Sequence, residues 1–170
     1  MLAQIDLMVR GSLIEFVDEV VRSSWRGRER EAISLYAFGF LQRQINGSRI
    51  LTDATQIGIE VTVPSDKSLN PKGRVCKDLV VWREPKMTCW NEGWEVVNYP
   101  LAILEWKAYR LKSSNLLVSR HDVEWLQRYS AFCPTSFVGY AISLDLLQRQ
   151  FCVCVTRVEN GHRQDSWLVM

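Results

Sequence analysis

The sequence has little of what marks membrane, secreted or nucleic-acid-coating proteins. No stretch reaches the roughly 18 apolar residues of a membrane-spanning helix, and the first residues carry Asp6, Arg10 and Glu15 instead of the apolar centre of a secretory signal. The formal net charge is only +2, which argues against a polycation but leaves room for a local basic patch. We therefore expect a cytoplasmic protein that does not contact membranes.

Histidine is scarce, and the cysteines are poorly spaced for metal binding. The chain has two histidines and five cysteines, and none of the cysteines forms a C-x-x-C pair, so a zinc site is not expected. His121 and Cys133 do not indicate a thiol hydrolase, because no third group or oxyanion turn accompanies them. The cysteines are interpreted as reduced, mostly buried thiols.

The composition is that of an ordinary globular protein. Hydrophobic residues make up 47% of the 170 residues and charged residues 24%, which is enough apolar material to bury a core. The length is typical of one domain. We therefore expect a single domain over residues 1–170, with its core at about residues 25–158.

Apolar periodicity predicts an alternation of helices and strands. Helices are predicted over 13–24 and, as a second helix or a continuation, over 26–45, ending at Asn46-Gly47. A third helix follows the S-x-x-D pattern at Ser119 and Asp122. Strands are predicted over 56–64, 75–82, 101–109, 137–143 and 151–158. This order predicts an α/β fold, with a central sheet flanked by helices.

Two ionisable residues interrupt the otherwise apolar strand 101–109. Glu105 and Lys107 are two positions apart, so they project from the same face of the strand. Burying either charge is costly unless it is paired or has a chemical task. Asp78 opens the apolar part of the preceding strand, and neighbouring strands would bring it to Glu105. The pattern thus predicts two carboxylates and an amine at one place in the sheet.

Such a group suits metal-assisted phosphodiester hydrolysis. Two adjacent carboxylates repel each other unless a cation joins them, and Mg²⁺ accepts one or two protein carboxylates while keeping several waters. A neighbouring lysine can orient the attacking water, or deprotonate it if its pKa is lowered. The alternative is structural: Glu105 and Lys107 form an ion pair on an exposed strand face, and Asp78 merely ends a loop.

Asp78 in "KDLVVW", followed 27 residues later by Glu105 in "EWK", resembles the PD-(D/E)XK nuclease superfamily. The resemblance covers about residues 25–145. It implies a restriction-endonuclease-like core, a mixed sheet flanked by helices in αβββαβ order. It also implies a Mg²⁺-dependent endonuclease or exonuclease, with Mn²⁺ as a substitute and DNA as the commonest substrate. Asp78 and Glu105 would bind the metal with the backbone carbonyl of Trp106, and Lys107 would position or activate the water.

Members of that family also tend to carry a glutamate on the first core helix, directed at the metal. Glu29 lies in line with an apolar stripe and is favoured for this role, with Glu31 as the alternate. The stripe consists of Ala32, Ile33, Tyr36, Ala37 and Phe40. Lys77 departs from the family pattern, since it occupies the place of the motif's proline.

Basic and aromatic residues near these motifs have two interpretations each. Those before Asp78 are candidates for binding nucleic-acid phosphates, or else belong to a solvated loop: Lys67, Lys72, Arg74 and Lys77. Trp90 and Trp94 could stack on bases, although such residues more often cover the edge of a core.

Two further questions stay open at this stage. The main alternative to a nuclease is a protein that keeps the fold without the chemistry and acts as a nucleic-acid-binding or protein-interaction module. A homodimer or a larger assembly is compatible with the sequence, and so are RNA or branched substrates.

Overall fold

A six-stranded mixed sheet forms the centre of the computed structural model, which describes residues 1–67, 71–87, 89–110, 116–147 and 152–170. Its strands lie side by side in chain order. Neighbouring strands are antiparallel except β3 and β4, which are parallel. The strands are β1 (Ile57–Pro64), β2 (Arg74–Trp82), β3 (Pro100–Tyr109), β4 (Val138–Asp145), β5 (Val153–Glu159) and β6 (His162–Val169). This arrangement confirms the predicted α/β class.

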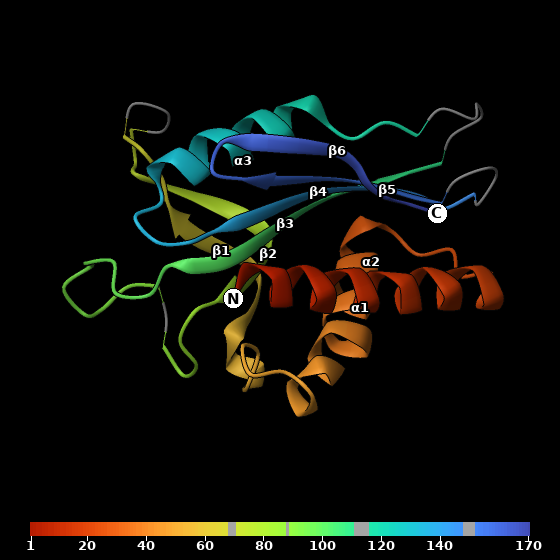
Figure 1. The fold of residues 1–170 in the computed structure, drawn as a ribbon, viewed down its shortest axis with the longest axis horizontal. Helices are drawn as coiled ribbons and strands as arrows, with labels where there is room; N and C mark the ends of the chain where they lie inside the picture. The colour runs from red at the N-terminus through yellow and green to blue at the C-terminus, as the bar shows by residue number, and fades with distance from the viewer. Residues whose placement is uncertain (68–70, 88, 111–115, 148–151) are drawn as a thin grey trace.

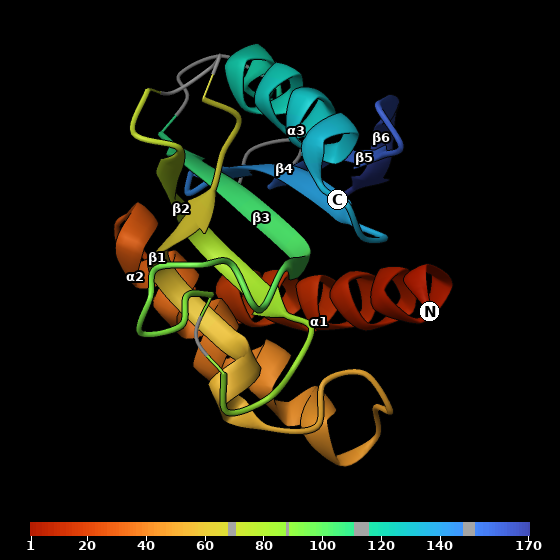
Figure 2. The ribbon, with the colours of Figure 1, turned by 90° about the vertical axis from the view of Figure 1, so that its left-hand side faces the viewer.

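Helices cover both faces of the sheet (Figures 1 and 2). One face carries α1 (Leu2–Ser23) and α2 (Glu29–Tyr36), and the other carries α3 (Arg120–Phe132), which connects the parallel strands β3 and β4. Short helical turns complete the secondary structure: a π turn at Ala37–Leu41 and 3₁₀ turns at Gln42–Asn46 and Ala54–Gln56. Among the helices described, none is both long and apolar enough to cross a membrane.

The two sides of β3 enter two separate hydrophobic cores. Leu104 and Trp106 pack into the core beneath α1 and α2, whereas Ile103 packs into the core beneath α3. This alternation was predicted from the sequence. Trp106 is the largest fully buried side chain and contacts Phe16 and Tyr36, with ring centroids 5.7 and 5.1 Å away. It fixes the direction in which its neighbours Glu105 and Lys107 project.

Helix α3 packs very closely against the sheet. At Gly139 in β4, an added Cβ would lie 2.7 Å from Cδ2 of Leu126, so a larger residue would force Leu126 of α3 to shift. The helix begins where the sequence predicted: Ser119 is its N-cap, and its hydroxyl accepts a hydrogen bond from the backbone N–H of Asp122 at 3.4 Å. Helix α3 is therefore held close to β4.

Three predicted elements need correction. The first helix begins at Leu2, not at residue 13, because buried Ile5, Met8 and Val9 continue its apolar face through the polar Ser12. Continuous α-helix does not cover 26–45, since α2 ends at Tyr36 and passes into π and 3₁₀ turns. Strand β6 was not predicted at all, because it is polar and exposed along most of its length.

Candidate active site

The pairing between β2 and β3 stops next to the two predicted carboxylates. The ladder includes Leu79 and Leu104, and Asp78 and Glu105 lie one step beyond that pair. There, Oδ2 of Asp78 accepts a hydrogen bond from the backbone N–H of Trp106 at 2.8 Å. A side-chain oxygen thus takes the place that a strand carbonyl would have, and the sheet opens where the E-x-K sequence begins.

Lys107 lies among oxygen atoms from three elements. Its Nζ donates to the backbone carbonyl of Trp106 at 2.8 Å. The same nitrogen is 3.9 Å from Oε1 of Glu29 on α2 and 3.9 Å from Oδ2 of Asp122 on α3. The Lys107 side chain is 37% exposed, so its ammonium group is accessible from solvent while held between two helices.

Glu29, and not Glu31, is directed at this place. Glu29 is the first residue of α2, and its Oε2 accepts a hydrogen bond from the backbone N–H of Ala108 at 2.9 Å. Glu31 is exposed and accepts instead from the backbone N–H of Arg28 at the start of its own helix. The geometry therefore agrees with the preference for Glu29, and the metal-binding role of either residue stays a prediction.

Asp122 is a site residue that the sequence interpretation missed. It was assigned only to the capping pattern of α3, yet its carboxylate is buried and faces Lys107. Like Glu29, it lies in the first turn of a helix, where the helix dipole favours negative charge. Its place near the N-terminus of a helix following the E-x-K strand is a signal that could have found it. We call Glu29, Asp78, Glu105 and Asp122 the carboxylate cluster.

Lys77 is not where the sequence interpretation put it. It was interpreted either as a phosphate-binding residue or as part of a solvated loop, but it lies in β2 with its side chain only 8% exposed. Its Nζ is 2.9 Å from Oε1 of Glu105 and 3.4 Å from the ring centroid of Trp125. The phosphate-binding assignment for Lys77 is therefore wrong, because a buried ammonium group cannot reach a phosphate. The structural alternative, an exposed Glu105–Lys107 ion pair, is also wrong, since Glu105 is buried and pairs with Lys77.

Burial is the main influence on the pKa of Glu105. Burial raises the pKa of its carboxyl group to about 7, and the nearby Lys77 ammonium only partly opposes this. Although Lys77 is 2.9 Å away, Oε1 of Glu105 accepts no well-aligned hydrogen bond from any described residue, so the contact is chiefly electrostatic. Glu105 is thus a buried carboxylate whose charge is incompletely satisfied.

For the pKa of Lys107, nearby charges outweigh burial. Burial lowers the pKa of its amine, but the four carboxylates outweigh this, Asp122 and Glu29 most strongly, and the pKa lies above its usual value. The ammonium form therefore dominates at neutral pH. A general-base role would need a lowered pKa, so this arrangement favours positioning over proton abstraction.

The carboxylate cluster supplies oxygen donors of the kind that Mg²⁺ takes. Oxygen atoms surround Lys107, and when Glu105 is ionised the four carboxylates exceed the ammonium groups of Lys77 and Lys107 by two negative charges. In the described part of the chain, no three acidic, histidine or cysteine side chains converge closely enough to hold a metal as they stand. Mg²⁺ commonly uses only one or two protein carboxylates together with waters and substrate phosphates, so its binding here stays a prediction.

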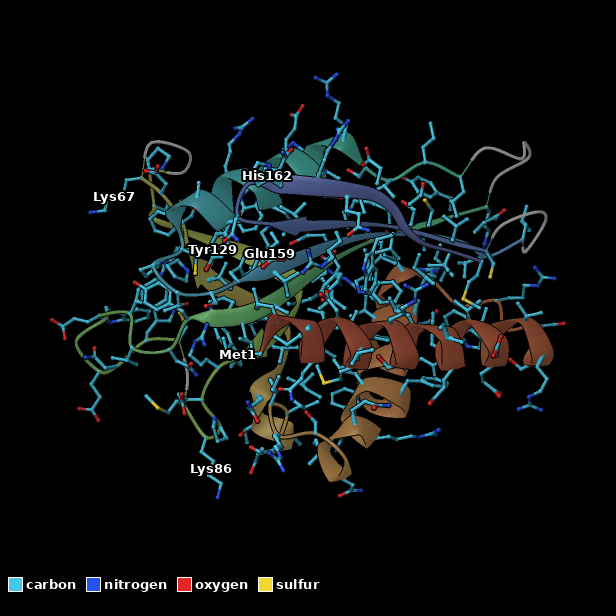
Figure 3. All side chains as sticks on the ribbon, viewed as in Figure 1. Met1, Lys67, Lys86, Tyr129, Glu159 and His162 are labelled. Atoms are coloured by element: carbon cyan, nitrogen blue, oxygen red, sulfur yellow. The ribbon has the colours of Figure 1, made fainter. Side chains whose placement is uncertain are left out.

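The remaining predicted residues lie outside the cluster. Lys67, Lys72 and Arg74 are exposed, and Lys67 extends outward at the periphery in Figure 3. Trp90 packs against the core beneath α3, as most such residues do, whereas Trp94 is 69% exposed and lies near Arg74, 5.7 Å from its guanidinium carbon. All five cysteines are free thiols, but only Cys89 and Cys152 are buried, whereas Cys133 and Cys154 are partly exposed and Cys76 is exposed.

No family model, curated protein or solved structure matches this chain. Its function is therefore inferred from the geometry and charge of the carboxylate cluster.

Proposed function

We propose that this protein is a Mg²⁺-dependent nuclease with a restriction-endonuclease-like core. The observation that carries the proposal is the Lys107 ammonium group, set among four carboxylates where the β2–β3 ladder opens. In support, α2, β1, β2, β3, α3 and β4 follow the αβββαβ order that the sequence resemblance implies. DNA is the proposed substrate.

Each cluster residue has a role in this proposal. Asp78, Glu105 and the Trp106 carbonyl would hold the metal, with Glu29 supporting it from α2. Neutralisation of the scissile phosphate and a lowered pKa of the attacking water are what bound Mg²⁺ supplies in such sites. Lys107, charged and partly exposed, would orient the water and stabilise developing negative charge.

A non-catalytic role remains the second candidate, and one observation favours it. Asp78 already accepts from the Trp106 N–H, and Glu105 is already paired with Lys77, so both carboxylates have partners without a metal. A binding module that retains the fold would keep these contacts. The two candidates differ in metal binding and in turnover.

A cleavage assay tests the proposal. Plasmid, linear, single-stranded and branched DNA, with RNA alongside, would be incubated with the protein in Mg²⁺, in Mn²⁺ and in EDTA. We expect metal-dependent cleavage of at least one DNA substrate and its loss in Asp78→Asn, which keeps an oxygen acceptor for the Trp106 N–H. Absence of cleavage, together with absence of any Mg²⁺-dependent rise in melting temperature, would refute the nuclease.

A further inference from the structure

Three exposed arginines lie next to the carboxylate cluster, where β3 ends. Arg26 and Arg28 belong to the segment that joins α1 to α2, and Arg110 directly follows β3. Arg28 precedes Glu29, which is 3.9 Å from Lys107. Figure 1 shows the α1–α2 segment on the same side of the molecule as the end of β3. The three arginines therefore lie at the end of the strand that carries Lys107.

Hydrogen bonds and packing hold this segment in place. Nη1 of Arg26 donates to the backbone carbonyl of Leu146 at 2.7 Å, and Nη2 of Arg110 donates to the backbone carbonyl of Arg26 at 3.1 Å. Trp25 packs against the core beneath α1 and α2, and its ring lies so close to Gly27 that no side chain fits there. The arginines thus project from a fixed backbone, and each guanidinium group retains N–H donors for a further ligand.

The charges of these arginines are not cancelled by ion pairs. Among the described residues, no carboxylate forms a salt bridge with any of the three, whereas the neighbouring Arg30 is 2.7 Å from Glu60. The two glutamates of the same segment are engaged elsewhere, Glu29 with Lys107 and Glu31 with the start of its own helix. Like charges on one surface repel each other unless an anion joins them, so this surface suits a polyanion.

We propose that Arg26, Arg28 and Arg110 form an anion-binding surface that holds the backbone phosphates of a nucleic acid beside Lys107. This rests on the proposed function, because it assumes that the substrate is a nucleic acid. Guanidinium groups bind phosphates through paired N–H donors, and phosphate contacts position a duplex independently of its sequence. None of the three arginines was predicted as a site residue from the sequence.

Binding of a short fluorescent DNA duplex in EDTA tests this without cleavage and without metal. Fluorescence anisotropy would give the affinity over a series of salt concentrations for wild type and for the triple variant Arg26→Gln, Arg28→Gln, Arg110→Gln. Each phosphate contact contributes about 0.9 to the slope of log affinity against log salt concentration, so the slope should become less steep by about 2–3. Arg28→Gln alone leaves the hydrogen bonds of Arg26 and Arg110 intact and should change the slope by about 1.

A second triple variant, Arg43→Gln with Arg49→Gln and Arg163→Gln, is the matched control. It removes the same charge from exposed arginines elsewhere, since Arg43 and Arg49 lie beyond the end of α2 and Arg163 lies in β6. The control variant should keep the wild-type slope, because a general loss of positive charge is not a loss of phosphate contacts.

The outcomes separate this inference from the proposed function. If wild type binds and cleaves DNA but the Arg28→Gln and triple arginine variants change the slope no more than the control does, the surface does not bind phosphates and this inference fails alone. If wild type neither binds the duplex nor cleaves DNA in Mg²⁺, the proposed function fails. A less steep slope in Arg28→Gln, at an unchanged melting temperature, would support the phosphate-binding surface.

Discussion

The two halves of Trp106 serve different parts of the molecule. Its indole is fully buried against Phe16 and Tyr36, while its backbone N–H donates to Asp78 and its carbonyl accepts from Lys107. Because the ring is anchored in the core, the strand cannot slip by one residue without burying the charged face. The residue between the glutamate and the lysine of E-x-K therefore sets the geometry of both.

Glu105 should make the stability of the metal-free protein depend on pH. Its pKa is about 7 when folded, above the ordinary value of 4.5, so the folded state binds the proton more tightly than the unfolded state does. Stability from this residue is therefore present at acidic pH and is lost as pH rises from about 4.5 through 7. We expect a loss on the order of a few kcal/mol, measured by urea unfolding in EDTA between pH 5 and 8.

Glu105→Gln is the control for this dependence. The variant cannot ionise at this position, so subtracting its pH profile from that of wild type removes the contributions of all other groups. A difference that stays constant, or that grows in favour of wild type with rising pH, would show that burial does not dominate the Glu105 pKa.

Some site residues were predictable from the sequence and others were not. Asp78, Glu105 and Lys107 were identified because charges stood out in apolar strands, whereas Glu29 was chosen for a role that the family resemblance implied. Lys77 was assigned to a loop because it follows a polar stretch, and only the structure shows that α3 covers it. Contact between a strand lysine and a helix 48 positions later is a tertiary property that local pattern does not encode.

At the level of elements, the site depends on how α3 is seated. Asp122 reaches Lys107 because α3 lies tightly against β4, with Leu126 filling the space left by Gly139. On the other face, α2 begins at Glu29, so the first turns of two helices meet Lys107 from opposite sides of the sheet. A shift of either helix would separate a carboxylate from the lysine.

Gly139→Ala should therefore disturb both stability and the site. Its Cβ would lie 2.7 Å from Cδ2 and 3.1 Å from Cβ of Leu126, so Leu126 must shift within the contact between α3 and the sheet. Overpacking of this kind costs about 1–3 kcal/mol. Thermal unfolding and the cleavage assay would measure the two effects, and we expect cleavage to fall along with the melting temperature.

Gly11→Ala is the matched substitution. Gly11 lies within α1, and an added Cβ there meets nothing within 4 Å, so alanine should be neutral or stabilise by up to about 1 kcal/mol. A Gly139→Ala protein as stable and as active as Gly11→Ala would show that the close approach of α3 is unimportant.

Element predictions failed where polarity masked the pattern. Helix α1 contains the buried Ser12, whose hydroxyl forms a hydrogen bond with that of Tyr36 at 2.8 Å. A core position is therefore occupied by a polar residue, which interrupts the apolar pattern. Strand β6 has little apolar signal, but Asn160-Gly161 joins it to β5 with positive φ at both residues, which is a strong hairpin signature. By contrast, β1 alternates, β2 and β3 contain apolar runs, and all three were placed within one or two residues.

For the molecule as a whole, the topology gathers distant residues at one opening. Glu29 comes from α2, Asp78 from β2, Glu105 and Lys107 from β3, and Asp122 from the helix that carries the chain to β4. The parallel β3–β4 pair requires that crossover, and this is what places α3 over the face opposite α2 (Figure 2). The site is thus a consequence of the fold.

The paired measurement of cleavage rate and melting temperature for Lys107→Ala, in Mg²⁺, tests the central claim most directly. Glu29 keeps the Ala108 N–H and Glu105 keeps Lys77, so few contacts are lost and stability should fall by no more than about 1 kcal/mol. Cleavage should fall by about 10²–10⁴-fold, the usual loss with a proton-handling or positioning group. Lys86→Ala, at an exposed lysine elsewhere, should change neither. A Lys107→Ala protein that melts much earlier yet keeps its specific activity would contradict the account, because Lys107 would then be structural.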